Sequence, residues 1–165
     1  VRSHPKEVTL MRRLVLLSGL PGSGKSTYVR ASFPNAVVIS SDEIRKGLTG
    51  SYAILAPDMQ DVYRAMIDKA NHVLRENDDV TIVLDSTFLD EERRMFFLSR
   101  IKGADQIVLI ALLYHSIDTV LSRNMAREKE KRVPESVILE MAQRFSLPKG
   151  EEKKRYAAIQ TVYID

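Results

Sequence analysis

The stretch Gly19-Leu20-Pro21-Gly22-Ser23-Gly24-Lys25-Ser26 decides how this chain folds, because it fits the pattern G-x-x-x-x-G-K-[ST]. An apolar run from Leu14 to Leu17 precedes it, and a helical pattern over 25–32 follows it. A strand, a glycine-rich turn and a helix in that order are the context in which this pattern binds phosphate. The sequence therefore predicts a P-loop, in which backbone N–H groups and a helix start surround phosphate oxygens.

The positions of this loop fit the binding of a nucleoside triphosphate together with Mg²⁺. The glycines let the backbone approach phosphate closely. We expect Lys25 to reach the β- and γ-phosphates and the Ser26 hydroxyl to ligate Mg²⁺. The predicted nucleotide-binding residues of the loop are Gly19, Leu20, Pro21, Gly22, Ser23, Gly24, Lys25, Ser26 and Thr27. The alternative is a glycine turn followed by a surface lysine, and the flanking strand and helix argue against it.

Short β-branched runs alternate with helical patterns along the rest of the chain. We expect strands over 14–17, 36–39, 80–84, 107–113 and 162–164, and helices over 25–32, 42–48, 57–76, 90–102, 117–128 and 134–146. Most of these strands are apolar on both faces, which is typical of a parallel sheet covered on both sides. The order βαβ(αα)βαβα(α)β predicts an α/β fold with a doubly wound parallel sheet and helices on both faces.

Composition sets the broad class of protein. The 165 residues are 44% hydrophobic and 28% charged, as in an ordinary globular domain. We expect one domain over 11–165, preceded by an N-terminal arm over 1–10. There is no cysteine, so no disulfide framework or thiolate metal site forms, and we expect a cytoplasmic protein. No apolar run approaches the roughly 20 residues of a membrane span, so we expect no membrane partner. A net charge of +3 is too small to indicate nucleic-acid binding.

The strand over 80–84 ends in Asp85-Ser86-Thr87, where open α/β sheets place their sites. We expect Asp85 to orient Mg²⁺ or hold the P-loop; the alternative is an aspartate that begins the next helix. The strings N-K-x-D and D-x-x-G, expected in a GTPase, are absent. No glutamate follows Asp85, as it would in an AAA-type ATPase that activates water. The sequence therefore favours transfer to a bound acceptor over hydrolysis.

The segment Ser40-Ser41-Asp42-Glu43-Ile44-Arg45 follows the second predicted strand and faces the same edge. Asp42 and Arg45 are three residues apart and share a helix face. A carboxylate there can accept the proton of an attacking hydroxyl, and an arginine can hold a phosphate or carboxylate of the acceptor. The alternatives are an i, i+3 ion pair and a capping box formed by Ser40 and Glu43. The local sequence leaves both possibilities open.

Arg123 and Arg127 are four residues apart, which predicts that they share one face of the helix over 117–128. Arginines in this place can close over the γ-phosphate and stabilise charge during transfer. The run Glu128-Lys129-Glu130-Lys131-Arg132 follows. It is either a mobile lid over the nucleotide or a solvated helix end, and the arginines are either functional or merely solvated.

Taken together, these motifs resemble the kinase domain of polynucleotide 5′-hydroxyl kinases of phage and bacterial repair enzymes. The motifs are Gly-Leu-Pro-Gly-Ser-Gly-Lys-Ser-Thr at 19–27, Ser-Asp-Glu-Ile-Arg at 41–45, Leu-Asp-Ser-Thr-Phe-Leu-Asp-Glu-Glu-Arg-Arg at 84–94, and Arg-Asn-Met-Ala-Arg at 123–127 followed by Val133-Pro134. The resemblance spans residues 13 to about 148. Ser41 departs from it, because such kinases often have arginine before the aspartate.

The resemblance implies a P-loop kinase-like fold with a helical lid, and roles for four residues. Asp42 matches the general base on the 5′-hydroxyl, and Arg45 matches the arginine that holds the phosphate after the acceptor nucleoside. Arg127 and Arg123 match lid arginines on the triphosphate. The implied activity is transfer of the γ-phosphate of ATP to the 5′-OH end of a nucleic acid. A kinase for a small hydroxyl compound and a non-catalytic nucleotide-binding module remain the alternatives.

Overall fold

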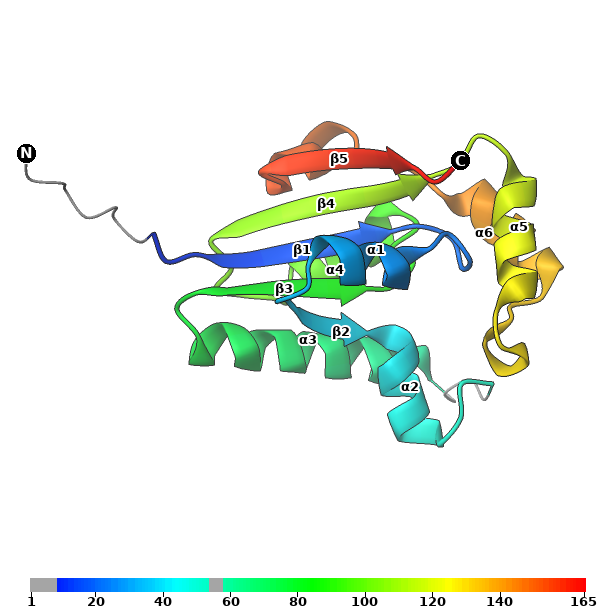
Figure 1. The fold of residues 1–165 in the computed structure, drawn as a ribbon. Helices are drawn as coiled ribbons and strands as arrows, with labels where there is room; N and C mark the ends of the chain where they lie inside the picture. The colour runs from blue at the N-terminus through cyan, green and yellow to red at the C-terminus, as the bar shows by residue number, and fades with distance from the viewer. Residues whose placement is uncertain (1–8, 54–57) are drawn as a thin grey trace, which may run out of the picture.

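A five-stranded parallel sheet forms the centre of the molecule (Figure 1). The structure is a computed structural model, and it describes residues 9–53 and 58–165. The strands are β1 (Arg12–Ser18), β2 (Val37–Ser40), β3 (Val80–Asp85), β4 (Gln106–Leu113) and β5 (Ala158–Tyr163), in the spatial order β2-β3-β1-β4-β5. Because β1 lies between β3 and β4, the loop after β1 is flanked by the loops that follow both neighbours.

Helices cover both faces of the sheet and its carboxyl end. They are α1 (Lys25–Ser32), α2 (Ser41–Thr49), α3 (Met59–Glu76), α4 (Glu91–Leu98), α5 (Ile117–Ala126) and α6 (Glu135–Arg144), with 3-10 helices η1 (Lys129–Lys131) and η2 (Gly150–Arg155). Figure 1 shows α1 on one face and α4 on the other, while α5 and α6 stand beyond the arrowheads of the strands. This places α5 and α6 over the edge where the P-loop lies.

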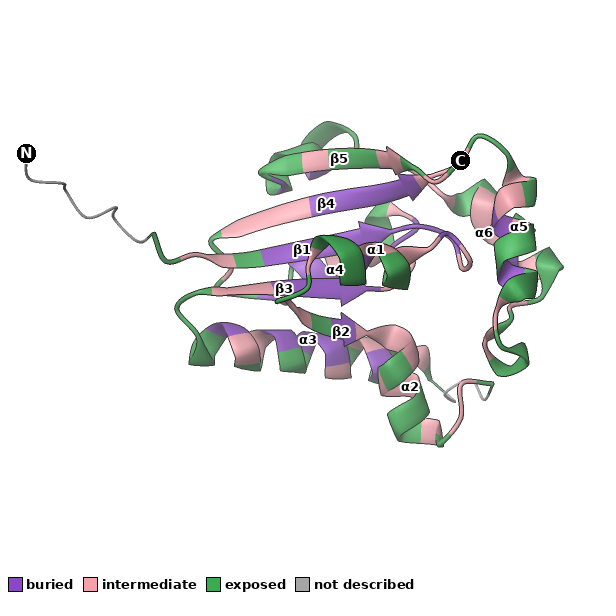
Figure 2. Cartoon of the chain, in the orientation of Figure 1, coloured by how far each residue is buried: buried purple, intermediate pink, exposed green. Residues whose placement is uncertain are grey.

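Alternate side chains of β1 supply two separate cores, which explains why its sequence is apolar throughout. Leu14 and Leu16 pack with α3 and α4 on one face, whereas Val15 and Leu17 pack with Val29 of α1 on the other. A third cluster joins Leu20 of the P-loop to α5 and α6. Figure 2 shows that burial is concentrated in the middle strands and in the helix faces that meet them. The prediction of a doubly wound parallel sheet is confirmed.

Several predicted boundaries of helices and strands were wrong. The helix predicted over 90–102 ends at Leu98, and the one predicted over 117–128 ends at Ala126. The last strand begins at Ala158, well before the predicted 162–164. The prediction missed its first residues because most of the strand is exposed and has no continuous apolar run. Pro134 precedes α6 as its N-cap instead of lying in the first turn. Pro57 and most of the predicted arm lie outside the described residues.

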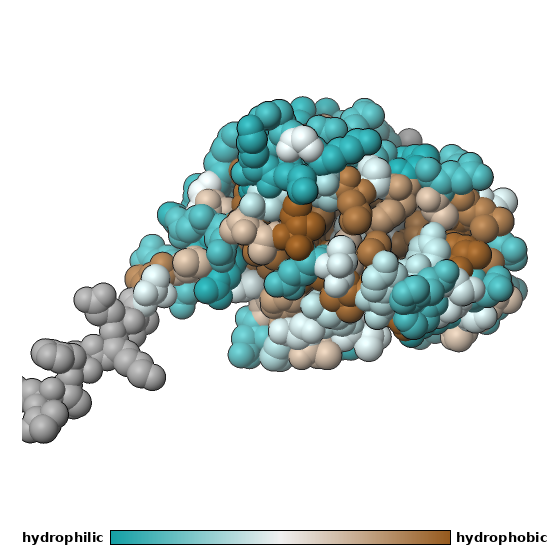
Figure 3. All heavy atoms as spheres, turned by 90° about the horizontal axis from the view of Figure 1, so that it is seen from above, coloured by the Kyte–Doolittle hydropathy of each residue, from teal (hydrophilic) through white to brown (hydrophobic). Residues whose placement is uncertain are grey.

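The sheet ends in the exposed edge strand β5. Figure 3 views the molecule from above, onto this edge, where apolar side chains form a band between more polar surfaces. Tyr163 of β5 is exposed over 53% of its surface. Among the helices of the described ranges, none has the length and apolar character needed to cross a bilayer.

A buried ion pair ties η2 to α4, next to the loop that follows β3. Arg94 forms a forked contact with Glu152, with Nε–Oε2 at 2.6 Å and Nη2–Oε1 at 2.8 Å. Arg94 Nη1 also donates to the carbonyls of Phe88 and Ser146, and the Tyr156 hydroxyl donates to Glu152. Burial and the hydrogen bond to Glu152 raise the pKa of Tyr156. The guanidinium and the carboxylate are both almost fully buried, so each depends on the other for its charge.

Glu152→Gln is expected to lower the free energy of unfolding by about 3–5 kcal/mol, because it leaves the Arg94 guanidinium buried without its carboxylate. Urea denaturation measures this change. Glu151→Gln is the matched control: Glu151 pairs with Lys154 at 3.0 Å, but both side chains are exposed. Exposed pairs contribute little, so this variant should unfold as the wild type does. Equal denaturation midpoints for the two variants would show that the buried pair does not hold the fold.

Candidate functional site

The P-loop is shaped by two glycines with positive φ and by hydrogen bonds to a neighbouring loop. Gly22 and Gly24 have φ of 82° and 86°, values that favour glycine. The Gly19 N–H donates to the Thr87 carbonyl in the loop after β3, at 3.0 Å. Gly24 is the N-cap of α1, and no side chain caps this helix. The first N–H groups of α1 are therefore left for an anion in the loop.

The P-loop packs directly against α5. A Cβ added at Gly22 would lie 2.9 Å from the Val120 carbonyl oxygen and 3.1 Å from the Asn124 backbone nitrogen. A Cβ at Gly24 would lie 3.1 Å from Arg123 Nη1. Glycine is therefore required at position 22 for close approach as well as for φ, and the Arg123 guanidinium lies next to the start of α1.

Lys25 and Asp85 form the charged centre of the loop. Lys25 Nζ donates to the carbonyls of Gly19 and Leu20, both at 3.0 Å. Burial lowers the pKa of Lys25, and the Asp85 carboxylate opposes that shift. Burial also raises the pKa of Asp85, while Lys25 opposes it. The lysine is thus folded back on the loop, with its ammonium where phosphate oxygens would replace the two carbonyls.

The pair Ser26 and Asp85 fits a magnesium ion. The Ser26 hydroxyl donates to Asp85 Oδ2 at 3.3 Å, which brings two hard oxygen ligands together beside the loop. In the described ranges there is no cluster of three His, Asp or Glu side chains that would hold a metal alone. Mg²⁺ commonly takes one or two protein oxygens and completes its shell with phosphates and water. Asp85 does not begin the next helix, because the N-cap of α4 is Asp90.

Asp42, in the first turn of α2, lies between two arginines from different parts of the chain. Its carboxylate oxygens lie 3.2 Å from Arg45 Nη2 and 3.9 Å from Arg127 Nη2. The Asp42 charge also raises the pKa of both Lys25 and Asp85, and the Arg127 charge lowers both. The structure therefore brings Asp42, Arg127, Lys25 and Asp85 into one electrostatic cluster. The i, i+3 ion pair with Arg45, expected as an alternative to function, is also present.

The two predicted lid arginines point in different directions. Because α5 ends at Ala126 and Arg127 is extended (φ −71°, ψ 159°), the prediction that they share one helix face is wrong. Arg123 Nη2 donates to the Ile164 carbonyl at 3.0 Å, next to the P-loop. Arg127 instead reaches across to Asp42. The bend after α5 thus carries Arg127 away from that helix and toward Asp42 of α2.

Asn124 closes the base of the loop that carries Arg127, a role that the sequence patterns did not predict. Its amide donates to the Val133 carbonyl at 2.7 Å and accepts from the Val133 N–H at 2.9 Å. Asn124 is buried, although it lies within the Arg-Asn-Met-Ala-Arg motif at 123–127. The sequence did contain one signal for this role: Asn124 is a polar residue at a helix position that packs inward, and buried polar groups need hydrogen-bond partners. The segment 125–132 is therefore a clasped loop containing η1, which we call the lid loop.

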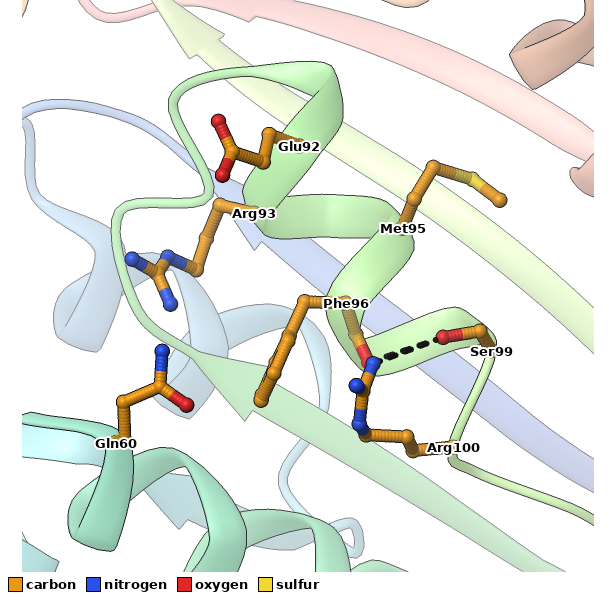
Figure 4. Close-up of a pocket in the computed structure, with 7 residues that line it drawn as sticks. All are labelled: Gln60, Glu92, Arg93, Met95, Phe96, Ser99 and Arg100. Carbon is orange, nitrogen blue, oxygen red and sulfur yellow. Dashed lines mark hydrogen bonds between the residues drawn. The ribbon is translucent and has the colours of Figure 1, made fainter.

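A separate hollow of about 400 Å³ lies between α3 and α4 (Figure 4). Arg93 lies over the Tyr63 ring at 4.0 Å and Arg100 over the Phe96 ring at 3.9 Å. Its lining residues are Gln60, Glu92, Arg93, Met95, Phe96, Ser99 and Arg100. None of them belongs to the predicted site, so this hollow is not the phosphate site.

Comparison with known proteins identifies the domain type. The AAA domain family AAA_33 matches residues 14–148. A curated relative, L-seryl-tRNA(Sec) kinase of Methanococcus maripaludis, is 26% identical over 138 residues. That alignment covers 82% of this chain but 53% of the relative, so the chain spans about half the length of the relative it matches.

Solved structures share the fold at low identity. A gluconokinase from Sinorhizobium meliloti 1021 has a TM-score of 0.62 and 17% identity, over 94% of this chain and 85% of its own. A chain of the Pnkp1/Rnl/Hen1 RNA repair complex has a TM-score of 0.65 and 18% identity, over 86% of this chain and 46% of its own. The fold is therefore that of P-loop kinases, with no acceptor specified.

Asn124→Ala is expected to speed trypsin cleavage within 127–132 by about 5- to 30-fold, because it removes two hydrogen bonds that close the lid loop. Limited proteolysis followed by mass spectrometry measures the rate. Asn71→Ala is the matched control, since the Asn71 amide makes the same kind of paired bond, to the Arg100 carbonyl and the Lys102 N–H. If Asn124→Ala leaves cleavage within 127–132 unchanged, the two bonds between Asn124 and Val133 do not hold the lid loop closed.

Proposed function

This chain belongs to the AAA domain family AAA_33, which matches residues 14–148, and on that premise we propose that it is a kinase that transfers the γ-phosphate of ATP to an acceptor hydroxyl. The observation that carries the proposal is the position of Asp42, between Arg45 and Arg127 and within electrostatic reach of Lys25. A carboxylate so placed is available to an acceptor beside the reacting end of a triphosphate. Ser86 follows Asp85, so the glutamate expected for activating water is absent there.

Each charged side chain has a separate task in the proposed transfer. The acceptor oxygen bonds to the γ-phosphorus, and the bond from that phosphorus to the β–γ bridging oxygen breaks. ADP leaves with the bridging oxygen, and Asp42 takes the proton of the acceptor hydroxyl. Lys25 exchanges its two carbonyl contacts for phosphate oxygens, while Arg123 and Arg127 stabilise the equatorial charge. Ser26 and Asp85 would hold Mg²⁺, which would supply positive charge to the triphosphate when bound.

The contact between Arg127 and Asp42 supports a role for Arg127 near the transferred group. At 3.9 Å the two charges attract, but the separation is longer than a hydrogen bond. In the complex we place the Arg127 guanidinium between Asp42 and the γ-phosphate. An arginine on an extended residue can turn toward phosphate without unwinding a helix.

We infer that the acceptor is the 5′-OH end of a nucleic acid. Arg45 lies beside Asp42, where it would meet a phosphate on the far side of the acceptor sugar. Among the similar proteins, one is named as a kinase of L-seryl-tRNA(Sec) and another comes from an RNA repair complex. The second candidate is a small hydroxyl compound, because a gluconokinase shares the fold over most of its length. A non-catalytic nucleotide-binding module is the third.

Transfer from γ-labelled ATP to a panel of acceptors separates these functions. The panel contains 5′-OH DNA and RNA oligonucleotides, gluconate and other small polyols. Label in the oligonucleotides supports the proposal, and label only in a small compound supports the second candidate. A module should bind Mg-ATP and label nothing. Binding of a 5′-OH oligonucleotide should weaken as salt rises, because phosphate contacts release counterions.

Lys25→Met is expected to weaken Mg-ATP binding by about 10- to 150-fold, the value of a charge-assisted hydrogen bond to phosphate. The fold should survive, because burial lowers the pKa of Lys25. Keeping its ammonium charged in the free protein therefore costs free energy of folding, and methionine removes that cost. Calorimetric titration and thermal melting measure the two effects. Lys69→Met, on an exposed position of α3, is the control and should bind normally. Tight Mg-ATP binding by folded Lys25→Met would reject the P-loop assignment.

Asp42→Asn is expected to lower the single-turnover rate of transfer by about 10²- to 10⁴-fold, the usual contribution of a general base. Its affinity for ATP should stay within a few fold. Asp61→Asn removes a carboxylate from the first turn of α3, outside the site, and should transfer normally. Undiminished transfer by Asp42→Asn excludes the base role, and a parallel loss of ATP affinity would assign Asp42 to the metal instead.

A further inference from the structure

We propose that the ring of Tyr52 is a stacking platform for the nucleobase attached to the phosphorylated sugar. This inference rests on the proposed function and adds a residue that selects acceptors bearing a base. Tyr52 follows α2 and lies on the acceptor side of the site, where its side chain is partly exposed.

The Tyr52 ring brings together two lysines from different elements. Lys46 Nζ of α2 lies 4.4 Å from the ring centroid, and Lys131 Nζ of η1 lies 4.6 Å from it. In residues 9–53 and 58–165, no carboxylate lies within ion-pair distance of either ammonium. The two charges thus rest on a π surface that a base can share or replace. The displaced ammoniums are then free for phosphates of the same nucleic acid.

Hydrogen bonds fix Tyr52 at both its backbone and its hydroxyl. The hydroxyl donates to Glu43 Oε1 at 2.5 Å, and the carbonyl accepts from Arg45 Nη2 at 3.0 Å. Ser40 still caps α2 by accepting from the Glu43 N–H at 3.4 Å. The Glu43 side chain, however, bonds Tyr52, so only half of the predicted capping box forms. A ring fixed in this way loses little freedom when a base stacks on it.

Arg45 connects the platform to the proposed base. The same guanidinium nitrogen contacts Asp42 and the Tyr52 carbonyl. Arg45 Nε is buried and has no hydrogen-bond partner in the described part of the chain. A phosphate oxygen of the acceptor would supply one. Asp42, Arg45 and Tyr52 therefore offer neighbouring contacts for the hydroxyl, the phosphate and the base of one terminal nucleotide.

An open hollow of about 590 Å³ lies beside the platform. It is lined by Ala53, which follows Tyr52, and by Glu128, Lys129 and Glu130 of the lid loop. A volume of this order suits a small planar group. The Glu128 and Glu130 carboxylates repel phosphate but can accept hydrogen bonds from the amino group of a base. Lys129 also lines the hollow, so two carboxylates are set against one ammonium there. This balance favours the base in the hollow and the phosphates on the side of Arg45 and Lys46.

The test pairs a change in Tyr52 with removal of the base. Wild type, Tyr52→Leu and Tyr52→Phe are compared on two 5′-OH oligonucleotides that differ only at the 5′ end. One carries adenine there and the other an abasic tetrahydrofuran sugar. Phe96→Leu is the control, because its ring also lies under a guanidinium, Arg100 at 3.9 Å, outside the site.

We expect Tyr52→Leu to lower kcat/KM for the adenine end by about 10- to 100-fold, the range that one base–aromatic stack supplies. The abasic end should be a poor acceptor that Tyr52→Leu leaves unchanged, and Tyr52→Phe should retain most of the adenine preference. Equal losses on both ends, or no loss, would overturn the platform while leaving the kinase assignment intact. Failure of the wild type to label either oligonucleotide, with Mg-ATP bound, would reject the nucleic-acid acceptor and the platform together.

Discussion

The site depends on how one buried carbonyl, that of Phe88, is held. It accepts from Ser18 Oγ at the end of β1, at 2.9 Å, and from Arg94 Nη1, at 3.1 Å. Phe88 itself has a φ of 42°, an uncommon value for a bulky residue that costs about 1–2 kcal/mol. The bonds from Ser18 and Arg94, together with full burial of the ring, keep it there. Because the adjacent Thr87 carbonyl accepts from Gly19, the shape of this loop fixes the first residue of the P-loop relative to Asp85.

Three parts of the chain meet at Asp42, and each contributes a different kind of contact. The P-loop supplies rigid backbone donors and Lys25, while α2 supplies Asp42 and Arg45. The lid loop supplies Arg127 and Lys131, which contact Asp42 and Tyr52 respectively. The lid loop thus rests against α2 and the Tyr52 that follows it, while Arg123 stays beside the P-loop. The proposed kinase function uses this division, because donor and acceptor approach from opposite sides of one carboxylate.

Sequence patterns predicted the local features well and the long-range ones poorly. The P-loop, its flanking strand and helix, and the position of Asp85 follow from residues that lie close together in the chain. The helix end at Ala126 was missed because Arg127 continues the helical spacing while its backbone is extended. The pairing of Arg94 with Glu152 joins residues 58 positions apart, and spacing carries no signal for it. Asn124 was missed although it lies at an inward-packing position of α5, because its partner Val133 lies outside that helix. Tyr52 was missed because it belongs to no periodic pattern, and its partners became visible only in the folded chain.

The clasp made by Asn124 has a consequence for the entropy of ligand binding. Its two bonds to Val133 join residues nine positions apart, so the lid loop is closed at its base before any ligand arrives. Closing a loop restricts its chain conformations, and that restriction is already present in the free protein. A triphosphate then has to immobilise only a few side chains, Arg127 foremost, instead of a long free segment. The folding of the chain, rather than the ligand, provides most of the order in the lid loop.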